Sequence, residues 1–104
     1  MLKGIVFKGD ILSIKAMDID DILSDETCAV IVDDKNREIY LWVGKSASVQ
    51  DKFKAARTAQ MLNWKFFGGA ARIVQDHAKI RTVLVKYARI DEDIPTAEIK
   101  MIIG

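Results

Sequence analysis

The chain has 104 residues, 50% of them hydrophobic, and its 16 basic and 15 acidic side chains give a formal net charge of +1. That length accommodates one domain with one core, and so balanced a charge lacks the positive field of a general nucleic-acid binder. The apolar runs are far shorter than the roughly 20 residues of a membrane-spanning helix. A single cysteine, Cys28, excludes an internal disulfide and favours a reducing, cytoplasmic compartment.

The N-terminal half predicts short strands joined by turns. Residues 5–7 form a short apolar strand, and residues 12–16 alternate apolar and polar side chains, which is the period of a half-buried strand. Residues 18–25 are acidic and predict a loop. Residues 28–33 are apolar almost throughout, so this strand is expected to be central and covered on both faces. A charged turn then leads to its antiparallel partner, residues 39–43.

A long helix follows this pair of strands. Either Ser46 or Ser48 is a suitable N-cap, because a serine hydroxyl accepts an otherwise unpaired backbone N–H of the first turn. Asp51 then falls in that turn, where a carboxylate favours the positive end of the helix dipole. The helix is expected to continue to about Phe66 and to stop at the glycine pair 68–69.

Beyond the helix, residues 72–75 predict another strand and residues 78–90 a second, shorter helix with apolar side chains spaced for one face. Pro95 breaks the chain, and the apolar tail 95–104 is expected to be an extra strand or a flexible segment. Strands separated by two helices predict a single α+β domain over residues 1–104. The sheet should be mixed, because a long helical connection can return a strand parallel to its neighbour.

The long helix carries more apolar side chains than one buried face needs. At about 100° per residue, the stripe expected to face the sheet consists of Ala55, Ala59, Leu62 and Phe66. The opposite side holds residue types that are enriched in protein interfaces: Phe53, Arg57, Met61 and Trp64. Two interpretations stay open. Either this side is covered within the chain, by the C-terminal tail or by wrapping into the core, or it binds a partner by entering a groove.

Several motifs follow one another in the order and approximate spacing of gelsolin/villin-type domains, which this chain resembles. They are Lys8-Gly9-Asp10, Ala29-Val-Ile-Val-Asp33, Glu38-Ile-Tyr-Leu-Trp-Val-Gly-Lys45 and Ser48-Val-Gln-Asp-Lys-Phe-Lys-Ala-Ala56. The most specific element is the strand ending Trp42-Val43-Gly44, with the helix acid Asp51 nine positions after the tryptophan. The resemblance implies a gelsolin-like fold, with a central mixed β-sheet sandwiched between one long and one shorter α-helix.

The resemblance also implies actin binding, because in the family's first repeat the long helix docks in the cleft between two actin subdomains. Carried over by alignment, the actin-facing positions are Lys54, Arg57, Thr58, Met61 and Trp64, to which the helix wheel adds Phe53. We therefore expect a cytoskeleton-associated regulatory module that sequesters monomers or caps filaments of actin or an actin-like protein. We expect no enzymatic activity, since the sequence offers no catalytic cluster.

The family suggests further contacts and one alternative function. Its members often bind phosphoinositides, so a weak contact with acidic phospholipids is expected of the scattered basic residues. The apolar tail could let the domain form a homo-oligomer. The alternative function is a non-actin scaffold that binds other proteins or itself, as gelsolin-like domains do in vesicle-coat proteins, because a fold does not fix a function.

Family domains also commonly bind calcium, which takes several oxygen ligands. Carried over, the candidate Ca²⁺ ligands are Asp51 in the long helix, Asp25 or Glu26 before the central strand, Asn63 near the end of the helix, and an acid of the segment 91–93 such as Asp93. The chain departs from the family pattern at Cys28 and Asn63, where the family has aspartates. The alternative interpretation makes Asp51 a helix-capping residue and the preceding acidic loop a solvated one.

Overall fold

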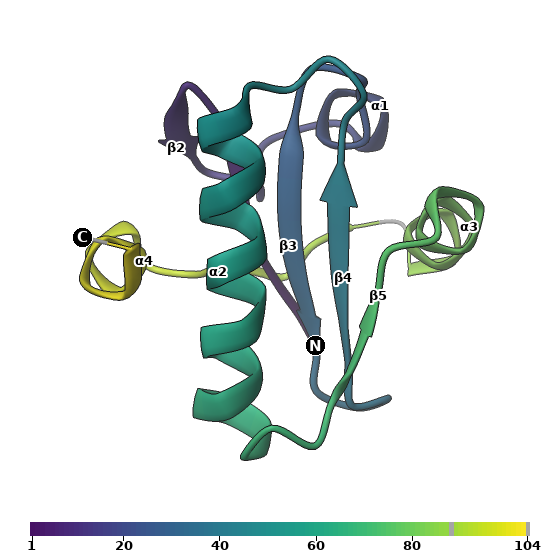
Figure 1. Cartoon of the computed structure of the whole chain (residues 1–104). Coiled ribbons are helices and arrows are strands. Elements are labelled where there is room, and N and C mark those ends of the chain that lie inside the picture. Colours follow the sequence, from purple (N-terminus) through teal and green to yellow (C-terminus); the bar gives the residue numbers. More distant parts are fainter. Residues whose placement is uncertain (88, 104) are drawn as a thin grey trace.

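The structure of the chain is a computed structural model that describes residues 1–87 and 89–103 (Figure 1). Its elements are β1 (Leu2–Lys8), β2 (Asp10–Leu12), α1 (Ile19–Ile22), β3 (Cys28–Asp33), β4 (Glu38–Val43), α2 (Val49–Phe67), β5 (Arg72–Val74), α3 (His77–Tyr87), β6 (Glu92–Asp93) and α4 (Thr96–Ile103). The strand order is β2-β1-β3-β4-β5, with β6 beside β1. Two pairs, β4–β5 and β1–β6, are parallel and the other pairs are antiparallel. The predicted α+β fold with a mixed central sheet is confirmed.

β3 lies between β1 and β4, and all of its residues are buried. Its side chains alternate between two cores, with Ala29 and Ile31 in one and Cys28, Val30 and Val32 in the other. Residues of α1 and α3 complete the first core, and residues of α2 and α4 complete the second. The strand is therefore apolar on both faces because helices cover both faces, as its sequence predicted.

The ends of α2 follow from local chemistry. The Ser48 hydroxyl oxygen accepts the backbone N–H of Asp51 at 3.0 Å, so Ser48 rather than Ser46 is the N-cap. Gly68 adopts a φ of 60°, in the left-handed region, and its N–H donates to a carbonyl of the last turn at 3.0 Å. This glycine cap ends the helix at Phe67, as the glycine pair predicted.

The C-terminal tail forms a helix, which corrects the expectation of an extra strand or a flexible segment over residues 95–104. α4 runs from Thr96 to Ile103, and its Ile99 is fully buried in the same core as α2. The physical reason lies in the spacing of the isoleucines. Ile99, Ile102 and Ile103 stand at i, i+3 and i+4, which places them on one face of a helix, whereas a strand would turn Ile102 and Ile103 to opposite sides.

The strand predicted at residues 12–16 ends early. The backbone N–H groups of Ile14 and Lys15 donate to the Asp93 carboxylate at 2.8 and 3.0 Å. Since these donors are engaged by a side chain, they do not extend the ladder between β2 and β1, which stops at Leu12. Ile14 is still fully buried, so its side chain faces the core as predicted although the residue does not belong to a strand.

The remaining differences concern boundaries. The predicted loop 18–25 contains the short helix α1, and the helix predicted over residues 78–90 is α3, which starts at His77 and ends at Tyr87. Positions 88 and 104, which belong to the predicted helix and tail, lie outside the described residues. None of the described helices is both long enough and apolar enough to cross a membrane.

Candidate functional site

The outer face of α2 is the surface predicted from Phe53, Arg57, Met61 and Trp64, and the structure adds Val49 at its N-terminal end. The exposed fractions are 81% for Val49, 66% for Phe53, 43% for Met61 and 68% for Trp64. The helix thus has a second apolar side that no described segment of the chain covers. The interpretation in which the tail or the core hides these side chains is wrong for this face.

α4 lies beside α2 rather than over its outer face (Figure 1). The Arg57 side chain reaches sideways to this neighbour, and its Nε donates to the Ile102 carbonyl at 3.1 Å. Lys65 forms an ion pair with Glu98 of α4. This flank was not predicted, although the helical spacing of the isoleucines in the tail indicates it.

Thr58 departs from the expected partner-facing set. It is fully buried, and among the described residues its hydroxyl has no hydrogen-bond partner. Thr58 stands three positions after Ala55 and four before Leu62, which places it on the face of α2 turned toward the sheet. It therefore belongs to the interior, and the expectation of a partner contact at Thr58 is corrected. Lys54 is half-buried on the flank beside α4.

Phe66 departs in the opposite sense. It was expected in the buried stripe but is 41% exposed. Its ring meets the side chain of Lys3, whose Nζ lies 5.7 Å from the ring centroid. Phe67, one position later, packs against the core instead.

Asp51, the first candidate calcium ligand, is held by the chain itself. It is buried, and its Oδ2 accepts the backbone N–H of Gly9 at 2.9 Å. Its own N–H donates to the Ser48 hydroxyl oxygen. The carboxylate thus joins the start of α2 to the turn between β1 and β2, which agrees with a structural role at the helix end.

The other candidate calcium ligands lie in separate surroundings. Asp93 accepts the Ser13 hydroxyl at 2.7 Å as well as the two backbone N–H groups described above. Burial raises the pKa of Asp93, but these hydrogen bonds together lower it by more, so its pKa lies below the usual value. Asn63 exchanges two hydrogen bonds with the backbone of Ala71 at 3.1 and 2.9 Å.

Asp25 and Glu26 complete the candidate calcium set and are both exposed in the turn before β3. Glu26 has an ion pair with Lys8 at 3.7 Å. Within residues 1–87 and 89–103, no group of three or more His, Cys, Asp or Glu side chains could hold a metal ion. The side chains carried over from the family form no such group among these residues, and Asp51, Asn63 and Asp93 each accept a hydrogen bond from the backbone.

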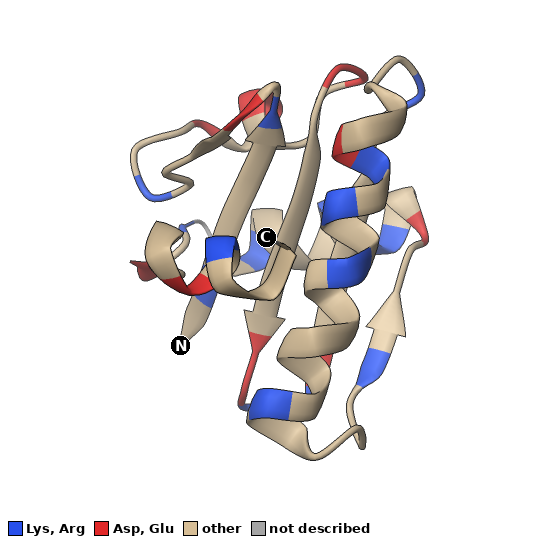
Figure 2. Cartoon of the chain, turned by 60° about the vertical axis from the view of Figure 1, so that its left-hand side comes forward, with Lys and Arg blue, Asp and Glu red and all other residues tan. Residues whose placement is uncertain are grey.

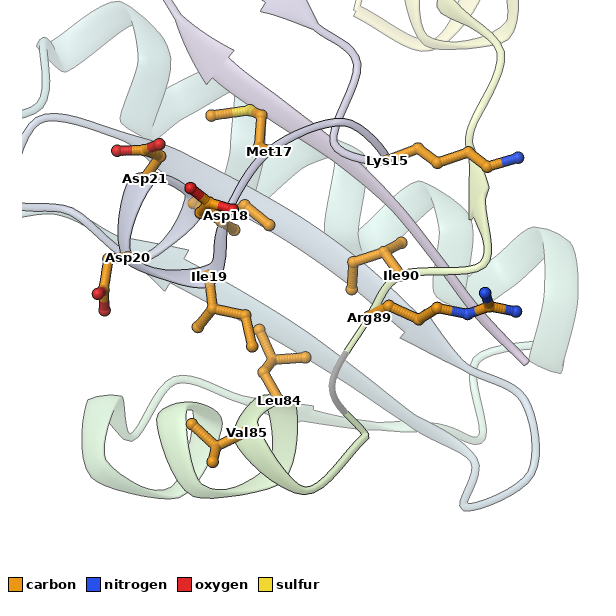
Figure 3. Close-up of a pocket in the computed structure, with 11 residues that line it drawn as sticks. Lys15, Met17, Asp18, Ile19, Asp20, Asp21, Leu84, Val85, Arg89 and Ile90 are labelled. Carbon is orange, nitrogen blue, oxygen red and sulfur yellow. The ribbon is translucent and has the colours of Figure 1, made fainter.

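A separate pocket of about 500 Å³ lies on the opposite side of the sheet, between α1 and α3 (Figure 3). Its lining is apolar where Ile19, Leu84 and Ile90 meet. Lys15 and Arg89 lie toward one end, and the aspartates of the α1 segment lie toward the other. The pocket therefore carries charges of both signs, and none of its lining residues is a serine, cysteine or histidine.

Two solved structures of other proteins are similar to this chain. No protein-family model and no curated protein matches the chain. Among solved structures, it is similar to Thorarchaeota ProGel, crystallised in complex with rabbit actin, with 20% identity, a TM-score of 0.53, and coverage of 98% of this chain and 99% of ProGel. It is also similar to Thorarchaeota 2DGel3, likewise crystallised with rabbit actin, with 21% identity and a TM-score of 0.58. That similarity covers 86% of this chain and 45% of 2DGel3, so the chain spans about half of that protein.

These similarities cover 98% and 86% of the chain. At this level of identity they establish the architecture, in which a long helix and a shorter one cover the two faces of a mixed sheet. This chain therefore has a gelsolin-like fold.

Proposed function

We propose that this chain is an actin-binding regulatory module, and that the outer face of α2 enters a groove on actin or an actin-like protein. The observation that carries this proposal is the exposure of Phe53, Met61 and Trp64 along one side of a helix whose other side is buried. Contiguous exposed apolar side chains of this size usually mark a site of interaction. An amphipathic helix in an apolar groove is a common mode of recognition.

The choice of actin as the partner is supported by the similar structures. ProGel and 2DGel3 were each crystallised with rabbit actin, and both share the fold of this chain. Binding is a property of those two proteins, and we transfer it here because the exposed helix face gives the same kind of partner a place to dock. The residue types agree as well, since Trp and Arg are frequent among the residues that dominate binding energy and Phe and Met are enriched in protein interfaces.

The outer face is also prepared for binding by its rigidity. The helix is capped at both ends and packed along its inner side, so little backbone freedom would be lost on docking. Full burial of one large apolar side chain contributes about 1.5–3 kcal/mol. Docking would bury only the part of Phe53, Met61 and Trp64 that is still exposed, so each contributes a share of this value toward the cost of association.

Regulation would follow from occupancy of the groove. A domain bound there prevents the next actin subunit from occupying the same surface. The chain would then sequester monomers or cap one end of a filament. Which of these two activities dominates depends on whether the bound groove is at a filament end or on a free monomer.

The decisive experiment measures the affinity of the whole chain for monomeric actin and its effect on actin assembly. We expect Trp64→Ala to weaken binding at least about tenfold, because a hot-spot aromatic contributes about 2 kcal/mol or more. The matched control is Val85→Ala on α3, which removes an exposed apolar side chain from the opposite side of the sheet. Absence of binding and of any effect on assembly at excess wild-type protein would refute the proposal.

The alternative function, a scaffold that self-associates, uses the same observation. The outer face of α2 could bury itself against a second copy instead of against actin. Sedimentation of the free protein distinguishes the two, because we expect a monomer with Trp64 accessible to a fluorescence quencher. A stable homo-oligomer in which Trp64 is protected would favour the scaffold.

Calcium modulation stays a prediction drawn from the family. The docking proposed above uses no metal ion, because the candidate ligands do not form one site in the described residues. Calorimetry of the metal-free protein tests the prediction directly. Heat of binding at sub-millimolar calcium, in the range of functional calcium sites, would support it, and no heat would end it.

A further inference from the structure

We propose that α4 forms a second wall of the docking surface, and that the groove between α2 and α4 takes an apolar side chain of actin together with a neighbouring carboxylate. This inference rests on the proposed function. It adds α4 to the surface that faces the partner, although only residues of α2 were expected there. The residues that carry it are Phe53 and Lys54 of α2 and Lys100 and Ile103 of α4.

The groove begins at the N-terminal half of α2. A depression of about 530 Å³ is lined by Val49, Gln50, Phe53, Lys54 and Ile103. Its walls are mostly apolar, because Val49, Phe53 and Ile103 form most of them. Val49 and Phe53 are largely exposed, and Ile103 is half-buried. The depression opens directly beside the outer face of α2, so a partner that covers Phe53 from above would also meet Ile103 from the side.

A second depression continues the first. It has a volume of about 720 Å³, and the two share Lys54 and Ile103 in their linings. Lys100 contributes a second ammonium group to this part, and Asp10 contributes a carboxylate at the far end. Figure 2 shows α4 and α2 side by side, with basic residues on both helices. The groove thus has Val49 and Phe53 at one end, Lys54 and Ile103 where the two depressions join, and Lys100 and Asp10 at the other end.

The lysines of the groove are available for a partner. Within residues 1–87 and 89–103, neither Lys54 nor Lys100 has an ion pair, whereas other lysines of the chain do, including Lys3, Lys65 and Lys79. An acidic side chain of the partner would complement this end of the groove and fix its direction. The occupant that fits is therefore an actin segment with a bulky apolar side chain next to a carboxylate.

The second wall is formed before binding. Ile99 anchors α4 in the core shared with α2, and the Arg57 side chain donates to the Ile102 carbonyl at 3.1 Å. These contacts hold the end of α4 against α2 without using Phe53, Lys54 or Lys100. A groove that is already shaped loses less conformational entropy when it is filled, so α4 can contribute to affinity even though it is a short helix.

The test compares two groove variants of the whole chain for affinity to monomeric actin. We expect Ile103→Asp to weaken binding about tenfold, because it places a carboxylate in the apolar wall that the two depressions share. We expect Lys100→Glu to weaken binding about threefold, with a larger effect at low salt, because it reverses a charge at the rim. Lys86→Glu on α3 is the matched control, since it makes the same charge change on an exposed lysine of the other side and should leave the affinity unchanged.

Each outcome separates this inference from the function on which it rests. If Trp64→Ala weakens binding while Ile103→Asp and Lys100→Glu bind like the wild type, actin docks on α2 alone and the groove proposal is overturned. If the wild type does not bind actin, both proposals fall together. If circular dichroism shows that Ile103→Asp loses the α4 helix, Lys100→Glu decides, because its exposed side chain does not support the fold.

Discussion

On the α1/α3 side of the sheet the large aromatic side chains have partners within the chain, whereas on the α2/α4 side Phe53 and Trp64 face solvent without such partners among the described residues. The Tyr40 hydroxyl donates to the Asp33 carboxylate at 3.0 Å. Trp42 stacks on His77 with ring centroids 3.8 Å apart, and its Nε1 donates to a backbone carbonyl at 2.8 Å. Polar contacts therefore complete the packing on this side.

The α2/α4 side also has an apolar core, but its outer surface differs. Its inner side chains are fully buried, yet Phe53 and Trp64 on the outside have no such partners among the described residues. The pocket lined by charges lies on the other side, between α1 and α3 (Figure 3). The surface most informative about function is therefore the one whose apolar side chains are not covered by the described residues, and a hollow alone does not identify it.

The largest expected effects test whether the two cores contribute equally to the free energy of unfolding. Leu62 of α2 and Leu84 of α3 are both essentially inaccessible to solvent. We expect Leu62→Ala and Leu84→Ala to lower the free energy of unfolding by about 2–5 kcal/mol each, because each leaves a cavity in a packed core. Urea denaturation followed by circular dichroism measures both.

Similar losses would show that the two cores support the fold equally and that the two sides differ only at their surfaces. A loss well below this range at Leu62 alone would contradict the comparison. It would mean that α2 is loosely packed on its inner face, and that its outer apolar residues are exposed because the whole helix is weakly held.

An intermediate effect is expected at the polar contacts of the α1/α3 side. Asp33 is buried and accepts hydrogen bonds from Asn36, Tyr40 and Tyr87. Asp33→Ala removes the shared acceptor and leaves the buried Tyr40 hydroxyl unpaired, which costs about 1–3 kcal/mol. We expect this loss in the free energy of unfolding at neutral pH, with the affinity for actin unchanged.

The same carboxylate predicts a pH dependence. Burial raises the pKa of Asp33, but the hydrogen bonds from Asn36, Tyr40 and Tyr87 outweigh it and hold the pKa below its ordinary value of 3.8. A lowered folded-state pKa stabilises the protein above the unfolded-state value, and this stability is lost as the pH falls through the folded-state pKa. The difference between wild type and Asp33→Ala should therefore shrink only at pH values below about 3.8. A difference that shrinks already near pH 6 would point to another group.

Most of the fold could be predicted from local patterns. The two-sided apolar strand at 28–33 and the serine and glycine caps of the long helix each depend on a few neighbouring residues, and the structure confirms them. α4 was missed because the spacing of its isoleucines was interpreted as an extended tail. The early end of β2 could not be predicted, because it depends on Asp93, which is distant in sequence from Ile14.

The candidate site was predictable to a similar degree. A helix wheel separates inward from outward side chains, so it identified Phe53, Met61 and Trp64 as an exposed set. The same wheel puts Thr58 beside Ala55 and Leu62 on the side turned to the sheet, so it argued against the partner contact that the family alignment implied there. The hydrogen bond between Asp51 and Gly9 joins two segments far apart in the chain, and no local pattern announces it.

The smallest expected effect concerns the contact between α2 and α4. Lys65→Ala removes the ion pair with Glu98, but the Lys65 side chain is 53% exposed, so water and salt screen the pair. We expect the free energy of unfolding to fall by no more than about 0.5 kcal/mol, as measured in urea, with little change in the hydrogen exchange of the α4 amides. The reason is that α4 is held by the buried Ile99 rather than by charge. If Lys65→Ala instead destabilised the protein as much as Asp33→Ala, polar contacts would complete the α2/α4 side as well. The exposed aromatic residues would then no longer distinguish the two sides of the sheet.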